Sequence, residues 1–272
     1  MTESRSRRQF SDLVAEVEIP LAQGALLIAC EEYPALDVPA YVTRIETMAS
    51  ELRAVWPESA TLEARLAALN DYLFGRLRFR GNDDDYFDPR NSFLNDVLDR
   101  RTGIPITLST VYLEVGRRVG LNVEGVGLPG HFIVRVDDRL VDPYAGGTLL
   151  SHADCQRRLD RIFEGRKQLD ASMLEPCPAR AMLERMLRNL KAIYVKNGDA
   201  LRALGVVELL LRLEPGSAGE LRDRALLHAE LGCYAFAARD LEELLLRVPA
   251  APDAGSLPSR IADLRQRAAR LN

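Results

Sequence analysis

Two stretches of this 272-residue chain decide its fold. The first is Arg100-Arg-Thr-Gly-Ile-Pro-Ile-Thr-Leu-Ser109, and the second is Pro129-Gly-His-Phe-Ile-Val-Arg-Val-Asp-Asp-Arg-Leu-Val-Asp-Pro143. Pro105 suits the first turn of a helix, where its missing N–H is not needed. The second stretch contains two short runs rich in Val and Ile on either side of Asp137 and Asp138, which indicates two antiparallel strands. We therefore expect a helix followed by a hairpin that carries His131 and Asp142.

The residues around these stretches have mainly helical periodicity. Apolar side chains recur at helical spacing in two N-terminal segments, namely Val42, Ile45, Met48 and Leu52, then Leu62, Leu66, Leu69 and Leu73. The helix that starts near Pro105 is expected to end at Gly120, and another, capped by Ser151 and Asp154, to run to Gly165. Short strands are expected at 123–128, 132–136 and 139–142. The pattern predicts a mostly helical α+β fold with a small antiparallel sheet.

The C-terminal part contains an internal repeat. Residues of the same type recur 34 positions apart, namely Leu187 and Leu221, Gly198 and Gly232, Ala203 and Ala237, and Pro215 and Pro249. This period, with small residues at a helix crossing and Pro at the end, is typical of tetratricopeptide repeats. Pro176 and Pro178 flank a break in the pattern. We therefore expect a first domain at 1–176 and an all-helical repeat region at 177–272, with a capping helix at 257–271.

Composition restricts the class of protein. The net charge of −4 argues against a nucleic-acid partner or an anionic membrane partner. The four cysteines have no CxxC spacing, so we expect neither a zinc site nor a disulfide framework, and no cofactor. The apolar run at 26–30 is too short to span a bilayer. A cytoplasmic protein is expected.

His131 and Asp142 are the first candidate site residues. If Asp137 and Asp138 form a two-residue turn, the residue numbers of each pair of facing positions sum to 275. The side chains of His131 and Asp142 then lie on the same face of the sheet. Asp142 could then accept the Nδ1–H of His131 and orient its ring, as the third member of a catalytic triad does. A helix, a strand with His and a strand ending in Asp follow the order of papain- and transglutaminase-type sites. Alternatively, His131 is an ordinary strand histidine.

A nucleophile would belong at the start of the helix that precedes this hairpin, because a helix N-terminus stabilises a thiolate. The sequence has no cysteine there. Thr102, Pro105, Thr107 and Ser109 are the residues available. Proline cannot act, and a hydroxyl would need a base within hydrogen-bonding distance. The alternative for Thr107 and Ser109 is that each bonds the helix backbone.

The polar segment between the helices has two interpretations. Asp83, Asp84, Asp85 and Asp88 could attract a hard cation, but the glycine and distal glutamate of a calcium loop are missing, so we expect a solvated turn and no metal. The remaining polar residues suit a loop that bonds its own backbone beside the His131 cleft and lines a groove for a ligand. These expected cleft-lining residues are Asn82, Tyr86, Asn91, Ser92 and Asn95, together with Pro105.

The same segments resemble a known family. The residues Arg78-Phe-Arg-Gly-Asn82, Asp85-Tyr-Phe-Asp-Pro-Arg-Asn-Ser-Phe-Leu-Asn95, Val97-Leu-Asp-Arg-Arg-Thr-Gly-Ile-Pro-Ile-Thr-Leu-Ser109 and Gly127-Leu-Pro-Gly-His-Phe132 are similar to those of the bacterial SirB-type family. The likeness runs from about Leu21 to the second repeat. It implies a papain- or transglutaminase-like core followed by tetratricopeptide-like repeats. It also implies that Pro105 occupies the cysteine position, while His131 and Asp142 match the other two triad positions.

Three functions follow from these observations. We expect a non-catalytic interaction or regulatory protein that binds a protein or peptide partner through its cleft and repeats. The alternative is a cryptic acyl-transfer or amide-hydrolysing enzyme, in which His131 activates Thr107, Ser109 or a water. In the third interpretation, His131 only completes a hydrogen-bond network in the core.

Overall fold

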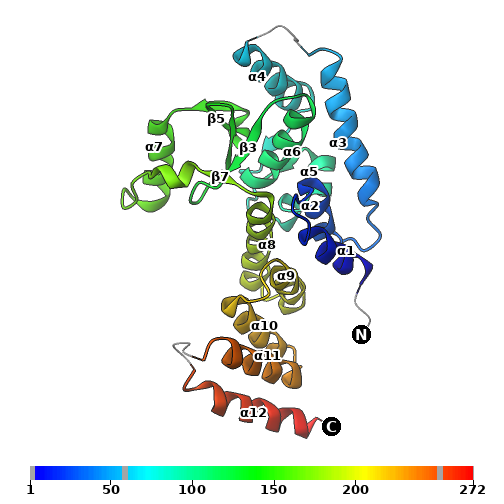
Figure 1. The fold of residues 1–272 in the computed structure, drawn as a ribbon, viewed down its shortest axis with the longest axis vertical. Helices are drawn as coiled ribbons and strands as arrows, with labels where there is room; N and C mark the ends of the chain where they lie inside the picture. Colours follow the sequence, from blue (N-terminus) through cyan, green and yellow to red (C-terminus); the bar gives the residue numbers. More distant parts are fainter. Residues whose placement is uncertain (1–3, 57–60, 250–253, 272) are drawn as a thin grey trace. The chain divides into compact units, whose positions relative to one another are not determined.

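The computed structural model describes residues 4–56, 61–249 and 254–271. Their contacts form two compact units, Glu16–Met186 and, as far as its residues are described, Met1–Ala15 with Leu187–Asn272. The expected fold class is confirmed, because a mostly helical core with a small antiparallel sheet is followed by helical repeats (Figure 1). The domain ranges 1–176 and 177–272 stay a prediction.

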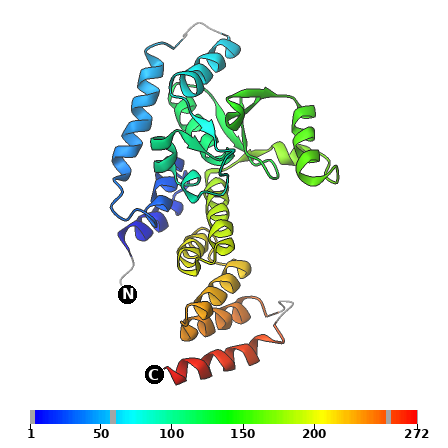
Figure 2. The same cartoon turned by 180° about the vertical axis from the view of Figure 1, so that it is seen from behind.

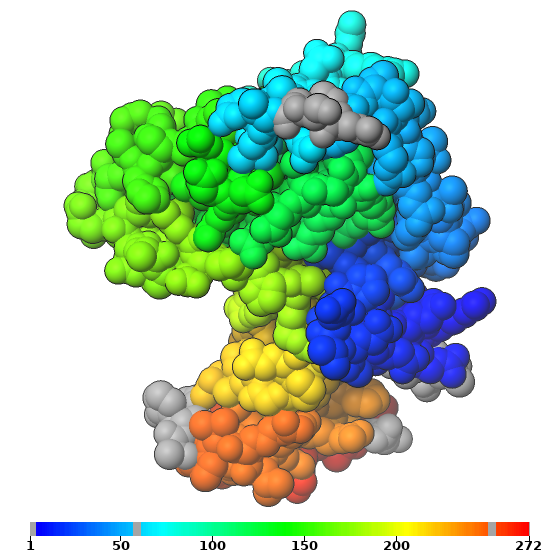
Figure 3. All heavy atoms as spheres, turned by 45° about the horizontal axis from the view of Figure 1, so that its top comes forward, coloured from blue at the N-terminus to red at the C-terminus, as the bar shows by residue number. Residues whose placement is uncertain are grey.

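Helices form most of the unit Glu16–Met186. The α-helices are α2 (Leu21–Ala29), α3 (Val38–Arg53), α4 (Leu62–Asn70), α5 (Leu94–Arg100), α6 (Pro105–Arg118), α7 (His152–Phe163) and the first part of α8 (Ala179–Lys196). Within its described residues, this unit also contains one π-helical turn, η1 (Asp71–Arg76). Its three 3-10 turns are η2 (Pro89–Asn91), η3 (Pro143–Ala145) and η4 (Ala171–Leu174). In the space-filling view α3 covers the outside of this unit beside α2 (Figure 3).

The sheet has the strand order β6-β5-β4-β3-β7, and all its neighbours are antiparallel. Its strands are β3 (Val123–Val126), β4 (Ile133–Val136), β5 (Arg139–Asp142), β6 (Thr148–Leu150) and β7 (Pro176–Cys177). Val134 pairs with Val141 and Val136 with Arg139, so the expected register is confirmed. The two outermost strands, β6 and β7, were not predicted. A separate parallel pair joins β1 (Arg80–Gly81) to β2 (Thr102–Gly103).

The sheet lies between two helices, α6 on one side and α7 on the other (Figure 2). Val126, Leu128, Ile133 and Leu140 form a buried cluster with Cys155 and Leu159 of α7. On the other face, Gly116 lets α6 approach β3, because a Cβ there would lie 2.8 Å from a methyl group of Val123.

Local sequence sets the ends of these helices as expected. Pro105 is the first residue of α6, and Gly120 follows its end with a φ of +89°, which glycine adopts without strain. Ser151 and Asp154 form a reciprocal capping box at the start of α7. None of the helices within the described residues is long and apolar enough to cross a membrane.

The second unit contains the repeats. Its helices are α1 (Arg5–Val14), the last part of α8, α9 (Ala200–Leu213), α10 (Ala218–Glu230), α11 (Tyr234–Arg247) and α12 (Leu257–Arg270). Ala203 and Ala237, which are one repeat apart, are both fully buried. Gly198 and Gly232 both have positive φ, +69° and +73°, in the turns between paired helices. The predicted repeat is confirmed, and α12 packs against α11 in the position of a cap.

An ion-pair cluster joins α10 to α11. Asp240 accepts hydrogen bonds from Arg224 (2.6 Å to Nη2) and bonds Nδ1 of His228 at 2.8 Å. Burial alone would raise the pKa of Asp240, but these hydrogen bonds hold that pKa below its ordinary value. The carboxylate therefore stabilises the folded repeats in its ionised form.

Substitution of Leu159 tests the core between α7 and the sheet. Leu159→Ala removes a fully buried side chain, so we expect the free energy of unfolding to fall by about 2–5 kcal/mol. Urea denaturation measures this change. Leu149→Ala, at a leucine that is 52% exposed on β6, is the control and should change the free energy by less than about 0.5 kcal/mol. Equal effects of the two substitutions would contradict the core as described.

Substitution of Asp240 tests the cluster in the repeats as a function of pH. The folded-state pKa is depressed, so the stabilisation is complete above the unfolded pKa of about 3.9 and is lost as the pH falls through the lower folded pKa. Asp240→Asn should therefore cost about 1–3 kcal/mol at neutral pH and progressively less below about pH 4. Urea midpoints over pH measure this, with exposed Asp84→Asn as the control. A penalty independent of pH would refute the assignment.

Candidate functional site

His131 and Asp142 meet, as the register predicted. Nε2 of His131 lies 3.0 Å from Oδ2 of Asp142. The histidine is 9% exposed, and the aspartate is fully buried. One detail of the prediction is wrong, because the ring uses Nε2 and not Nδ1. Within the described residues no protein group hydrogen-bonds Nδ1, so this nitrogen is left for a ligand or water.

Three further donors fix the carboxylate of Asp142. Its Oδ1 accepts the backbone N–H of Tyr144 at 3.0 Å and of Ala145 at 3.4 Å, so Asp142 caps the turn η3. Its Oδ2 also pairs with Nη2 of Arg158, on α7, at 2.5 Å. Arg158 was not among the predicted site residues, because helical spacing alone does not indicate the partner of an arginine. With these donors the ionised carboxylate is satisfied and held in one orientation.

The backbone of His131 is held from α8. Arg185 donates to the carbonyl of His131 at 2.8 Å and to that of Leu128 at 3.1 Å, and its guanidinium lies 5.3 Å from the ring centroid of Phe132. Burial lowers the pKa of Arg185, yet arginine stays protonated in proteins. In the same turn, Gly130 has a φ of +73°. A half-buried cation therefore helps to hold the backbone of the histidine.

Three aromatic side chains form a row that starts at His131, and we call Tyr144, Tyr86 and Phe87 the aromatic rim. The ring centroids of Tyr144 and His131 are 6.0 Å apart, those of Tyr86 and Tyr144 6.4 Å, and those of Tyr86 and Phe87 5.5 Å, all edge to face. The hydroxyl of Tyr144 donates to Asp83 at 2.7 Å. Tyr86 is 41% exposed and Phe87 58%. Tyr86 therefore contacts the ring of Tyr144, which in turn contacts the imidazole of His131.

The loop that carries Tyr86 and Phe87 bonds its own backbone, as expected. Nδ2 of Asn82 donates to Oδ1 of Asn91 at 3.0 Å, and Oδ1 of Asn82 accepts the N–H of Asp85 at 3.1 Å. Nδ2 of Asn91 donates to the carbonyl of Asp85 at 2.8 Å. Both asparagines are buried. They support the loop from within and present little surface to a ligand.

The start of α6 offers no activated hydroxyl. The hydroxyl of Thr107 donates to the carbonyl of Asn91 at 2.8 Å and accepts the N–H of Ile104 at 3.1 Å. That of Ser109 donates to the carbonyl of Phe132 at 3.5 Å. Both residues are fully buried, and no hydrogen bond joins either to His131 in the described part of the chain. Thr107 therefore anchors the loop to α6, and Pro105 occupies the first helical position.

The chain that leads into α6 nevertheless lies close to the site. A Cβ at Gly81 would lie 2.6 Å from the ring of Tyr144, and Gly81 pairs with Gly103 just before the helix. Ser92 and Asn95 are both buried, and Oγ of Ser92 and Oδ1 of Asn95 have no hydrogen-bond partner. Among the described residues, no hydrogen bond joins either of these two side chains to His131.

The cysteines of this unit are not activated. Cys155 is fully buried in the cluster under α7, and burial raises the pKa of its thiol. Burial also raises the pKa of Cys30 and of Cys177. A thiol with a raised pKa is a poor nucleophile at neutral pH. Among the described residues, no group of three or more His, Cys, Asp or Glu side chains is placed to hold a metal ion.

Comparisons with known proteins cover nearly the whole chain. The family model of the transglutaminase-like superfamily matches residues 39–188, and a tetratricopeptide repeat model matches residues 190–262. A UPF0162 protein of Xylella fastidiosa is 38% identical over 258 residues, which are 92% of each chain. A UPF0162 protein of Pseudomonas aeruginosa is 32% identical over 246 residues, 88% of this chain and 89% of that one.

A eukaryotic protein shares part of the sequence. F-box only protein 21 of Mus musculus is 29% identical over 186 residues, which are 62% of this chain and 28% of the mouse protein. The resemblance to the SirB-type family is confirmed by these matches. The chain, in which a transglutaminase-like region precedes tetratricopeptide repeats, belongs to the transglutaminase-like superfamily and, within it, to the UPF0162 proteins.

Proposed function

We propose that this chain is a non-catalytic interaction or regulatory protein of the cytoplasm that binds a protein partner through the aromatic rim and through its repeats. One observation carries the proposal. The start of α6, where the family resemblance places a nucleophile, has Pro105, and the nearby hydroxyl of Thr107 is committed to the carbonyl of Asn91. His131 and Asp142 thus form a pair without the group that they would activate.

The environment of that hydroxyl argues against an ordinary triad. A serine or threonine becomes nucleophilic when a base accepts its proton. Thr107 is fully buried and donates to a main-chain carbonyl, so its attack on a substrate would leave a buried acceptor unpaired. The bond from Ser109 to the carbonyl of Phe132 has the same consequence. Both hydroxyls are better suited to holding the fold.

The surface beside His131 supports binding. Tyr86 and Phe87 expose large aromatic faces, and aromatic side chains contribute a large share of the energy at protein interfaces. The unpartnered Nδ1 of His131 adds one polar group that can bond a peptide main chain. Aromatic faces beside a fixed polar group suit an extended segment of a partner protein.

The repeats support a protein partner independently of the rim. Tetratricopeptide repeats form extended binding surfaces because each helix pair contacts only its neighbours. Exposed apolar side chains such as Phe236 and Leu246 are available on this unit. The net charge of −4 favours a protein over a nucleic acid.

A displayed peptide library tests the rim. Peptides selected on the whole protein should lose affinity for the Tyr86→Ala, Phe87→Ala double variant by about 2 kcal/mol or more, a factor of about 30, in calorimetric titration. Leu149→Ala removes an equally exposed apolar side chain from β6 and should leave binding unchanged. If the selected peptides bind the double variant as tightly as the unchanged protein, the rim is not the binding surface.

A second candidate function, hydrolysis of an amide or ester by a water that His131 activates, is favoured by the His131–Asp142 bond and the unpartnered Nδ1. If our proposal is correct, the unchanged protein hydrolyses activated ester and amide substrates no faster than the His131→Gln variant does. Turnover that disappears in His131→Gln but persists in the Leu149→Ala control would reverse the proposal in favour of an enzyme. The stability of the His131→Gln variant tests the interpretation that the histidine is purely structural. In that case the substitution should lower the free energy of unfolding by about 1–3 kcal/mol.

A further inference from the structure

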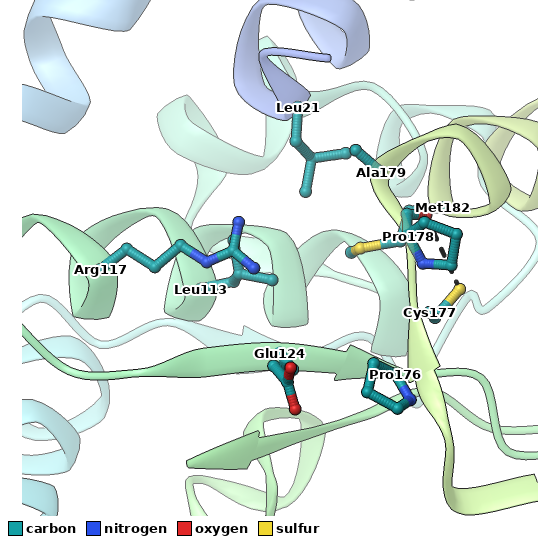
Figure 4. A pocket seen from close by; sticks show the side chains of 9 residues that line it. All are labelled: Leu21, Leu113, Arg117, Glu124, Pro176, Cys177, Pro178, Ala179 and Met182. Carbon is teal, nitrogen blue, oxygen red and sulfur yellow. Dashed lines mark hydrogen bonds between the residues drawn. The ribbon is translucent and has the colours of Figure 1, made fainter. Parts of the chain in front are cut away.

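A pocket unrelated to His131 lies where α6, β3 and the start of α8 meet (Figure 4). Its volume is about 230 Å³, and all its lining residues belong to the unit Glu16–Met186. Apolar side chains of Leu21, Leu113, Pro176, Pro178, Ala179 and Met182 line the pocket together with the polar or charged side chains of Arg117, Glu124 and Cys177. Leu21 points into the space from α2, and Met182 points into it from α8 (Figure 4).

Arg117 is the charged side chain that points into this pocket. Its guanidinium extends from α6 toward Leu113 and Leu21, whereas the carboxylate of Glu124 points away from them (Figure 4). The lining therefore combines apolar side chains with one guanidinium that is turned inward, while the carboxylate of Glu124 is turned away from it. Such a combination attracts a ligand with one negative charge on an apolar body.

The guanidinium is held in place but not neutralised. Nε of Arg117 donates to the carbonyl of Val123 at 2.7 Å, which orients the side chain. In the described part of the chain, neither Nη group of Arg117 has a hydrogen-bond or ion-pair partner. The nearby carboxylate of Glu114 is already used, because it pairs with Arg118 and accepts the N–H of Ala22 at 3.1 Å. Two parallel N–H donors thus remain, which is the arrangement that binds a carboxylate in a bidentate manner.

The start of α8 adds to the positive potential. Ala179 is the first residue of this 18-residue helix and lines the pocket, so the positive end of the helix dipole lies at the wall. Pro178, the residue before Ala179, has neither an N–H group nor a polar side chain that could take the place of a ligand. The contribution of the dipole is secondary to that of Arg117, because the field of a helix end is screened by solvent and falls off within the first turn.

We propose that this pocket binds a small monocarboxylate with an apolar body about the size of a leucine side chain. The carboxylate pairs with the two Nη groups of Arg117, and the apolar body contacts Leu21, Leu113 and Met182. Pockets for drug-sized ligands have roughly 300–1,000 Å³, so this smaller cavity excludes nucleotides and other large ligands. Its apolar walls would leave a hydrated polyanion unsatisfied. The inference does not depend on the proposed partner binding.

Two sources share this chemistry, namely a free short-chain acid and the C-terminal residue of a peptide. We suggest NMR titration of the full chain with isocaproate, with the neutral isohexanol, and with acetyl-Ala-Leu that carries either a free or an amidated C-terminus. Isocaproate should shift the backbone amide signals of Leu113 and Met182 and bind at least about tenfold more tightly than isohexanol. Tighter binding of the free-acid peptide would identify a peptide terminus as the ligand, and failure of that peptide to bind would identify a free acid.

Two variants with a matched control complete the test. Arg117→Gln should weaken isocaproate about tenfold or more, and Ala179→Leu, which fills the pocket and keeps the arginine, should abolish binding. Arg166→Gln removes one exposed arginine elsewhere in the same unit and should leave the affinity unchanged. The proposal is overturned if isocaproate and isohexanol bind alike, if neither binds, if Arg117→Gln binds as the unchanged protein does, or if the shifted signals lie outside the pocket.

Discussion

The bond between His131 and Asp142 is the interaction on which the site depends. It forms because a two-residue turn at Asp137 and Asp138 sets the strand register, and because Asp142 is buried among four donors that keep it in one orientation. Burying a carboxylate is costly unless its oxygens are paired. The main-chain N–H groups of η3, the imidazole and Arg158 together meet that requirement, so the pair can persist without any catalytic use.

Much of the fold could be predicted because its signals are local. Pro105 and Gly120 mark the ends of α6 through their own backbone preferences, and the 34-residue spacing of Gly198 and Gly232 predicts the paired helices of the repeats. The two outer strands escaped prediction because they contain only two and three residues. Pro176 also argued against a strand, and it is tolerated only because β7 lies at the sheet edge.

The site was less predictable, because its decisive contacts join distant segments. Hairpin register brought His131 and Asp142 together, but which nitrogen faces the carboxylate depends on ring rotation, and the ring packs against Tyr144. Arg158 and Arg185 come from α7 and α8, and an arginine on a helix surface gives no indication of its partner. The backbone hydrogen bond of Thr107 could be predicted, because a threonine in a helix commonly donates to a nearby main-chain carbonyl.

The shortness of β6 and β7 has a consequence for behaviour at high concentration. A sheet edge with free N–H and C=O groups can recruit strands of other molecules and start aggregation. Here one edge is a two-residue strand that begins with Pro176, which has no N–H to offer, and the other is only three residues long. An incoming strand would find too few main-chain partners on either side to form a lasting ladder, so the sheet itself discourages fibril growth.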